Sequence, residues 1–179
     1  VDGITGPAPT FGETGVTPGP VLLDAAHPYN AALQHIRTRV LARTAQGGHR
    51  ITAVAHRVVH GGAKYSDPVR VDAGVLADLR GYIPLAPLHQ PFALEAIAAL
   101  LQGSPDLPQV ACFDTAFHHT LPDVEKMLPL SWDAWQRGLR RYGFHGLSYE
   151  FMSHALAERY GDAARGRTLV AHLGSGASL

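Results

Sequence analysis

Reactive side chains stand at three places in this sequence where a short apolar run ends or a glycine follows. Arg57 lies within one apolar run, Asp114 directly follows another, and His145 lies between Phe144 and Gly146. The planar guanidinium of an arginine can bind a carboxylate or a phosphate through two parallel hydrogen bonds. A carboxylate can orient a reacting group, and an imidazole can stabilise charge on a phosphoryl group during its transfer. Together these residue types suit phosphoryl transfer.

A glycine-rich turn, Gly174-Ser175-Gly176, follows His172 near the end of the sequence. Because glycine has no Cβ, main-chain N–H groups in such a turn can approach phosphate oxygens closely. Triplets of this kind also occur in ordinary hairpin turns. The turn therefore supports a phosphate site only in combination with the other residues.

Each of these residues also has a structural interpretation. Asp114 could cap a turn or the next helix, and a single arginine or histidine at a strand end is more often structural than catalytic. Cys112, the only cysteine, is interpreted as a small buried hydrophobe and not as a nucleophile. The functional interpretation gains weight because open α/β sheets bind ligands at the carboxyl ends of their strands, where Asp114 is expected.

The composition argues against two large classes of binding protein. Lys and Arg (15) balance Asp and Glu (15), so no basic surface for nucleic acid or for an anionic membrane is expected. The longest mostly apolar run, residues 92–101, is too short to span a bilayer. One cysteine and no recognisable signal peptide indicate a reducing compartment, so a cytoplasmic protein is expected.

Strand and helix patterns alternate along the chain. Runs rich in Val and Ile predict strands at 51–59, 109–113 and 168–173. Helices are predicted at 28–46, at 75–79 with Asp72 as N-cap, at 90–102 with Gly103 after its end, at 131–135, and from Ser148 to Tyr160 with Ser148 as N-cap. Such alternation predicts an α/β fold with a largely parallel sheet and helices on its faces, the helix at 28–46 among them. Residues 1–20 are expected to be irregular or an edge strand.

Five sequence blocks extend the argument from residue types to a family. On these blocks, which cover the chain from about Thr52 to its end in the family's order, the chain resembles acetate kinase and its propionate and butyrate kinase relatives. Any single block would be unspecific, whereas five in order are highly specific. The blocks are His56-Arg-Val-Val-His-Gly-Gly62, Pro84-Leu-Ala-Pro-Leu-His-Gln-Pro91, Phe113-Asp-Thr-Ala-Phe-His-His119, Arg141-Tyr-Gly-Phe-His-Gly146 and Ala171-His-Leu-Gly-Ser-Gly-Ala-Ser178.

The resemblance implies a fold and an activity. The fold is the ribonuclease-H-like, actin-like α/β class, here as an incomplete mixed sheet. The activity is direct transfer of the γ-phosphoryl group of ATP, with Mg2+, to a short-chain carboxylate such as acetate, giving an acyl phosphate. The expected partners are that carboxylate and ATP, with no nucleic acid and no membrane, and a homodimer that forms through a C-terminal half not present in this sequence.

The resemblance also implies residue roles. Arg57 corresponds to the group that grips the substrate carboxylate, Asp114 to the active-site acid and His145 to a stabiliser of the transition state. Because a carboxylic acid acceptor is already ionised at neutral pH, Asp114 is interpreted as an orienting or metal-side group and not as a general base. The substrate pocket is assigned to Val59, Leu88 and His89, and the ATP phosphate site to His172, Leu173, Gly174, Ser175 and Gly176.

The sequence departs from the family pattern in three ways. Ser175 replaces the usual Asn of the phosphate turn, the opening motif Asn-x-Gly-Ser-Ser-Ser-x-Lys is not found, and no C-terminal half follows. Residues 1–179 are therefore expected to form a single incomplete N-terminal domain. Residues 168–179 would begin the phosphate hairpin of the next domain, no metal ligand is assigned within the chain, and the chain alone is not expected to turn over.

Two other functions stay open at this point. Eleven histidines could indicate a metal-dependent hydrolase, although no His-x-His, His-Glu-x-x-His or Cys-x-x-Cys spacing occurs. The chain could also be a non-catalytic binding module that keeps an actin-like or chaperone-like fold. Acetate and propionate cannot be separated as substrates, since one methylene changes discrimination by only about 1–3 kcal/mol.

Overall fold

The computed structural model describes all residues, 1–179, and centres on a three-stranded mixed sheet. Its strands are β3 (Val54–Val58), β5 (Gln109–Phe113) and β4 (Val69–Arg70), in the order β3-β5-β4. β3 runs parallel to β5, whereas β4 runs antiparallel to it. β5 agrees with the predicted strand to the residue, whereas β3 is shorter than the strand predicted at 51–59. The two-residue β4 was missed because it is too short to show a period.

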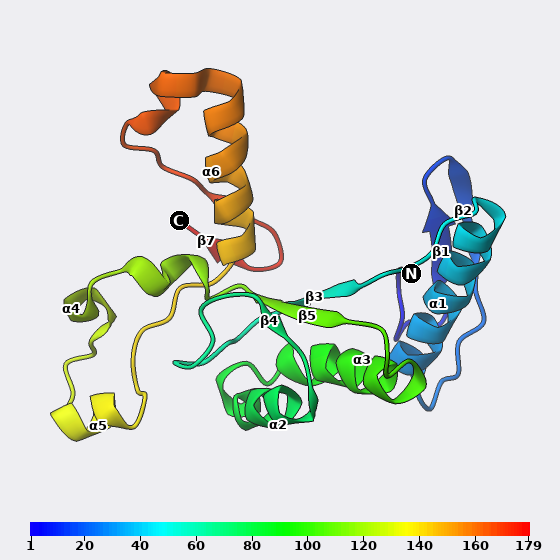
Figure 1. Cartoon of the computed structure of the whole chain (residues 1–179), viewed down its shortest axis with the longest axis horizontal. Helices are drawn as coiled ribbons and strands as arrows, with labels where there is room; N and C mark the ends of the chain where they lie inside the picture. The colour runs from blue at the N-terminus through cyan, green and yellow to red at the C-terminus, as the bar shows by residue number, and fades with distance from the viewer.

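Two helices cover one face of this sheet (Figure 1). α2 (Ala73–Gly81) begins after Asp72, whose side chain accepts a hydrogen bond from the N–H of Val75 at 2.8 Å, as predicted for an N-cap. A short 3-10 helix, η1 (Ile83–Leu85), leads to α3 (Gln90–Gly103). The buried core lies between these helices and the sheet and consists of Val58, Val71, Leu76, Leu79, Leu94, Ile97, Ala111 and Phe113.

The opposite face of the sheet is largely open. Side chains alternate along a strand, so Arg57 and Cys112 lie side by side on the face away from Val58 and Phe113. Figure 1 shows no helix over the greater part of this face, and α6 (Gly146–Tyr160) stands at the end of β5. On this face the side chain of Arg57, near the carboxyl end of β3, is exposed to solvent.

The N-terminal segment forms a separate unit at one end of the molecule (Figure 1). A hairpin of β1 (Thr10–Glu13) and β2 (Val16–Pro20) packs on α1 (Pro28–Gln46), with Arg39 and Arg43 both bonded to Glu13. The bounds predicted for α1 are confirmed, but the prediction that it covers a face of the sheet is wrong. Ala32 is its only buried residue, because the hairpin and the side of α3 take the place of the sheet as its neighbours.

The C-terminal part forms two arms. One carries η2 (Phe117–Thr120), α4 (Asp123–Lys126) and α5 (Trp132–Gln136), and the other carries α6, η3 (Gly161–Arg165) and the strand pair β6 (His172–Leu173) and β7 (Ala177–Ser178). The strand predicted at 168–173 is therefore confined to its last two residues. α6 starts two residues before Ser148, so Ser148 lies inside its first turn and is not its N-cap.

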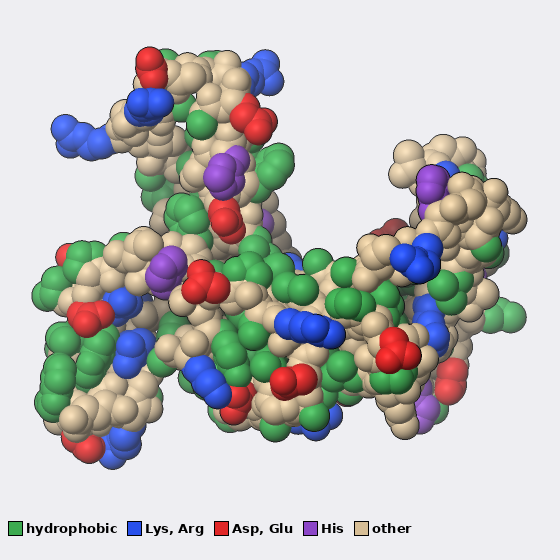
Figure 2. Space-filling model, in the orientation of Figure 1, with side chains coloured by type: hydrophobic (Ala, Val, Ile, Leu, Met, Phe, Trp, Pro, Cys, Tyr) green, Lys and Arg blue, Asp and Glu red, His purple; other side chains and the backbone are tan.

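The molecule has an open outline, and charges of both signs are scattered over the visible face (Figure 2). Only 20 of the 179 residues are buried, which reflects arms that contact the central sheet over small areas. No helix combines the length and the apolar character needed to cross a membrane.

Candidate active site

Arg57 and Asp114 meet at the carboxyl ends of two parallel strands. The N–H of Asp114 donates to the carbonyl oxygen of Val58 at 3.1 Å, which continues the β3–β5 pairing by one residue. Nε of Arg57 lies 3.1 Å from both carboxylate oxygens of Asp114, and Nη2 lies 2.5 Å from Oδ2. The Asp114 side chain is 3% exposed, whereas that of Arg57 is 62% exposed. A buried acid is thus neutralised by a guanidinium that reaches solvent.

This pairing leaves part of the guanidinium free. Arginine has five N–H donors in a fixed plane. Asp114 engages the Nε–Nη2 edge, and Nη1 has no hydrogen-bond partner within the chain. The hydrogen bonds that Arg57 donates to Asp114 raise the pKa of Arg57, so the group stays positively charged. Arg57 can therefore accept a second anion at Nη1 while Asp114 holds its orientation.

His145 is placed beside this pair by an unusual backbone conformation. It is the only non-glycine residue with positive φ (57°), in the left-handed region, and it immediately precedes α6. Such a conformation costs an L-residue about 1–2 kcal/mol. The N–H of Gly146 donates to the carbonyl oxygen of Asp114 at 2.8 Å. A Cβ on Gly146 would lie 2.3 Å from that oxygen, so glycine is needed for α6 to start this close to β5.

His145 stacks on His172 from the β6 strand. The ring centroids are 4.1 Å apart and the planes differ by 9°. Partial burial lowers the pKa of His145, and the nearby His172 lowers it further, while Asp114 acts in the opposite direction. His145 is therefore expected to be uncharged at neutral pH and to offer an N–H rather than a full positive charge.

The glycine turn closes the other side of His145. The N–H of Gly174 donates to the carbonyl oxygen of Gly176 at 3.0 Å within the β6–β7 turn. A Cβ on Gly176 would lie 3.2 Å from Nε2 of His145. Ser175 and Leu173 are exposed and contribute no buried contact, so the side of the turn that approaches His145 is mostly main chain.

The residues predicted for the substrate pocket are less closely gathered. Val59 is half-buried directly after β3, and His89 is exposed at the start of α3, close enough to lower the pKa of His145 by its charge. Leu88 is 79% exposed in the loop before α3. The structure therefore brings Arg57, Asp114, His145, His172 and Gly176 together and leaves Leu88 in solvent.

Two serines that the sequence analysis did not assign to the site contact its histidines. Oγ of Ser178 lies 2.8 Å from Nδ1 of His145, and Oγ of Ser148 lies 3.1 Å from Nδ1 of His172. Ser148 had been interpreted as a helix cap, and Ser178 had no role beyond closing the last sequence block. No local pattern identifies either one, because each bond joins residues more than twenty positions apart.

His60, by contrast, is a core residue. It is 1% exposed, and its Nδ1 accepts a hydrogen bond from the N–H of Gly62 at 2.9 Å. Burial lowers the pKa of His60 to about 4. Its ring packs against Tyr142 and Phe144, so it supports the segment that leads to His145.

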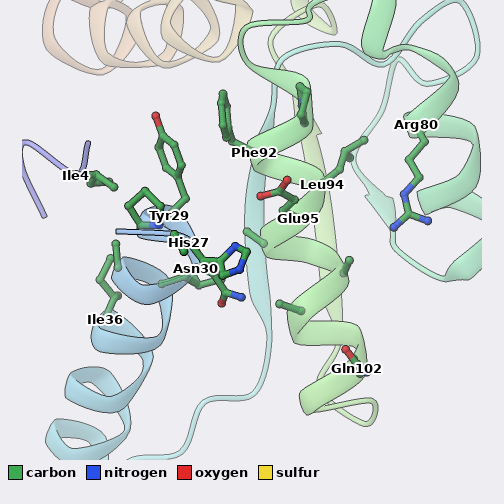
Figure 3. A pocket seen from close by; sticks show the side chains of 18 of the residues that line it. Ile4, His27, Tyr29, Asn30, Ile36, Arg80, Phe92, Leu94, Glu95 and Gln102 are labelled. Atoms are coloured by element: carbon green, nitrogen blue, oxygen red, sulfur yellow. The ribbon is translucent and has the colours of Figure 1, made fainter. Parts of the chain in front are cut away.

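A large cavity lies away from these residues. It has a volume of about 910 Å³ and lies between α1 and α3, where Tyr29 and Phe92 face each other with ring centroids 4.5 Å apart (Figure 3). A second cavity of about 670 Å³ adjoins the candidate site and is lined by Phe144, Tyr149 and Ser178, among others. No three His, Cys, Asp or Glu side chains gather in a way that could hold a metal ion.

Comparisons with known proteins point to one family. A family model described as the Acetokinase family matches residues 18–179. The chain is 55% identical over 132 residues to the acetate kinase of Rhodopseudomonas palustris, and this match covers 73% of this chain and 33% of that protein. It is 41% identical over 136 residues to the acetate kinase of Rickettsia typhi, and this match covers 76% of this chain and 35% of that protein.

Solved structures agree. A propionate kinase from Francisella tularensis matches with a TM-score of 0.67 and 35% identity, over 79% of this chain and 38% of that chain. The acetate kinase of Porphyromonas gingivalis matches with a TM-score of 0.62 and 42% identity, over 70% of this chain and 32% of that chain. The chain thus spans about a third of the length of the relatives it matches.

Proposed function

Because this chain belongs to the acetokinase family, we propose that it supplies the carboxylate-binding part of a kinase that phosphorylates acetate or a similar short-chain carboxylate with ATP. The fold agrees with this family: the likeness to acetate and propionate kinase structures confirms the expected actin-like α/β class. The observation that carries the proposal is the meeting of Arg57, Asp114 and His145 at the ends of β3 and β5.

Arg57 is the proposed carboxylate-binding group. Its free Nη1 and its 62% exposed side chain allow it to bind an incoming anion from the open face of the sheet. Asp114 fixes the guanidinium plane through the opposite edge. An acceptor carboxylate is ionised at neutral pH and has no proton to lose, so Asp114 acts as an orienting group rather than as a base.

His145 is the proposed stabiliser of the phosphoryl group in transfer. An uncharged imidazole can donate an N–H to an equatorial oxygen of that group. The glycine turn beside Nε2 of His145 supports an ATP phosphate site formed by His172, Leu173, Gly174, Ser175 and Gly176. Val59, Leu88 and His89 stay the proposed pocket for the acyl group, with Leu88 needing to move from its exposed position.

Magnesium accompanies ATP in such kinases, and we assign it no ligand within this chain. Mg2+ is usually bound by one or two carboxylates together with phosphates. The buried carboxylate here is Asp114, and both its oxygens accept hydrogen bonds from Arg57. Asp114 is therefore not free to bind Mg2+. A homodimer and a cytoplasmic location are further parts of the proposal, supported by the family resemblance and by the single cysteine.

The proposal is tested by a chimera. The segment of the Rhodopseudomonas palustris acetate kinase that matches this chain is replaced by the residues of this chain, and acyl phosphate formation from ATP is measured with acetate and with propionate. We expect acetyl phosphate at a rate clearly above that of a mock chimera carrying Arg57→Ala and Asp114→Asn together. A folded chimera that forms neither acyl phosphate would instead favour the non-catalytic binding module.

A further inference from the structure

The contacts around the stacked histidines form a reciprocal link between a helix and a hairpin. His145, at the start of α6, contacts Ser178 in β7 at 2.8 Å. His172, in β6, contacts Ser148 in the first turn of α6 at 3.1 Å. Each element thus gives one imidazole and one hydroxyl, and each imidazole uses its Nδ1. From this arrangement we propose that Ser178 is a positioning residue that fixes the proton of His145 on Nε2. The proposal rests on the function proposed above for His145.

In the proposed hydrogen bond the hydroxyl of Ser178 donates to Nδ1 of His145. A neutral imidazole has one N–H and one acceptor nitrogen, and a serine hydroxyl can donate or accept. Oγ of Ser178 has no other hydrogen-bond partner, so its proton is free to be donated to Nδ1 of His145. His145 then carries its proton on Nε2. The hydroxyl thereby selects one of two tautomers that an unrestrained imidazole would populate together.

The selected nitrogen is the one that faces the glycine turn. Nε2 and Cε1 of His145 would lie 3.2 Å and 3.3 Å from a Cβ on Gly176, so the glycine keeps the space beside Nε2 open. An N–H at this position points at the turn proposed to receive the phosphates. The other tautomer would present a lone pair there, which would repel the oxygens of a phosphoryl group.

His172 fixes the ring plane, while Ser178 fixes the proton. The stack at 4.1 Å and 9° limits tilting of the His145 ring away from the plane of His172. The left-handed backbone at His145 limits the main chain at the same residue. Neither restraint determines whether Nδ1 or Nε2 carries the proton. Ser178 is the only residue within hydrogen-bond distance of Nδ1, so it alone can determine this.

The test compares isosteric variants of the full chain by NMR. Two-bond 1H–15N correlations of the imidazoles report which nitrogen carries the proton. In the unmodified chain we expect the Nε2–H form of His145 to exceed the Nδ1–H form by about tenfold. Valine and threonine have nearly the same shape, but only threonine has a hydroxyl. Ser178→Val should therefore show a mixture of tautomers, whereas Ser178→Thr should keep the Nε2–H form.

Two outcomes overturn the proposal. The first is an unmodified chain in which His145 carries its proton on Nδ1, and this needs no variant to fold. The second is a Ser178→Val variant in which the signals of His145, of His172 and of the β6–β7 backbone all move together, because Ser178 would then only hold the hairpin in place. A change confined to the His145 ring supports a positioning role.

Activity gives an independent readout. In the active chimera, Ser178→Val should lower kcat about tenfold more than Ser178→Thr, with little change in the KM for acetate. A chimera that is inactive without any substitution would refute the proposed function while leaving the tautomer result valid. Equal kcat values for the two variants in an active chimera would refute the positioning role and leave the proposed function intact.

Discussion

Nε and Nη2 of Arg57 hold both carboxylate oxygens of the buried Asp114, with the shortest distance, from Nη2 to Oδ2, at 2.5 Å. This pair joins β3 to the residue after β5, and the main chain of Asp114 in turn receives the N–H of Gly146. One aspartate therefore orients the arginine through its side chain and the start of α6 through its carbonyl group. The site depends on both contacts.

Replacing Asp114 by asparagine should weaken the fold and release Arg57. The amide keeps the shape but has one oxygen acceptor, and its NH2 group would face a guanidinium. We expect the free energy of unfolding to fall by about 1–3 kcal/mol, the cost typical of a buried polar group left without its partner. Urea denaturation measures this.

The matched control is Asp162→Asn. Asp162 pairs with Arg165, but their side chains are 91% and 83% exposed. Such a pair contributes little to stability, so this change should stay within about 0.5 kcal/mol. Equal losses of unfolding free energy in Asp114→Asn and Asp162→Asn would contradict the stabilising role of Asp114.

Gly146→Ala should disrupt the junction between β5 and α6. The added Cβ would lie 2.3 Å from the carbonyl oxygen of Asp114 and 2.9 Å from Cβ of Phe117, and neither can move away freely. We expect a loss of about 1–3 kcal/mol, typical of overpacking, together with a shift of the His145 imidazole signals.

Gly81→Ala in α2 provides the comparison. Nothing lies within 4 Å of a Cβ at this position, and the residue is helical. Alanine is a better helix former than glycine, so Gly81→Ala should be neutral or stabilising by up to about 1 kcal/mol. If Gly146→Ala were also neutral or stabilising, α6 could not approach β5 as closely as described.

The pH dependence of stability should report His60. Burial lowers its pKa to about 4, from the ordinary histidine value of 6.5. Between these values the unfolded chain binds a proton that the folded chain excludes, so stability rises with pH and is lost as the pH falls below about 6.5. From pH 7 to pH 5, His60 alone should account for a loss of about 2 kcal/mol.

His60→Asn removes this titration and keeps a side-chain acceptor near the position of Nδ1, which accepts from the N–H of Gly62. Urea denaturation at both pH values should give a smaller pH-dependent loss for this variant than for the unmodified chain, even if the variant is less stable at pH 7. His49→Asn, a change at an exposed residue in the turn after α1, should leave the pH-dependent loss unchanged. A loss that persists in full without His60 would assign the effect to other groups.

The sequence predicted the elements that have strong local patterns. β5 matched to the residue, and α3 and the N-cap of α2 were also correct, because their periodicity, prolines and Asp72 act locally. The position of α1 was wrong, since an amphipathic pattern identifies a face to be covered but not the element that covers it. β4 was missed because its two residues show no period. The true start of α6 was missed because it depends on a hydrogen bond to Asp114, which is distant in sequence.

The candidate site was predictable in its residue types but not in its contacts. Placement of Arg57 and Asp114 at strand ends followed from the apolar runs before them. That Asp114 would hold Arg57, and that serines would hold both histidines, could not be predicted, because these hydrogen bonds join separate parts of the chain. Family assignment of the chain is confirmed by the comparisons, whereas the individual residue roles stay predictions.

The most direct test of the account is the kinetic effect of Arg57→Ala in the chimera. If Arg57 binds the substrate carboxylate, its loss should lower kcat/KM for acetate at least about 100-fold, or roughly 3 kcal/mol, while the KM for ATP changes little. Arg165→Ala, at an exposed pair far along the chain, should leave both values as they are. An unchanged rate and an unchanged KM for acetate in the Arg57→Ala chimera would contradict the account.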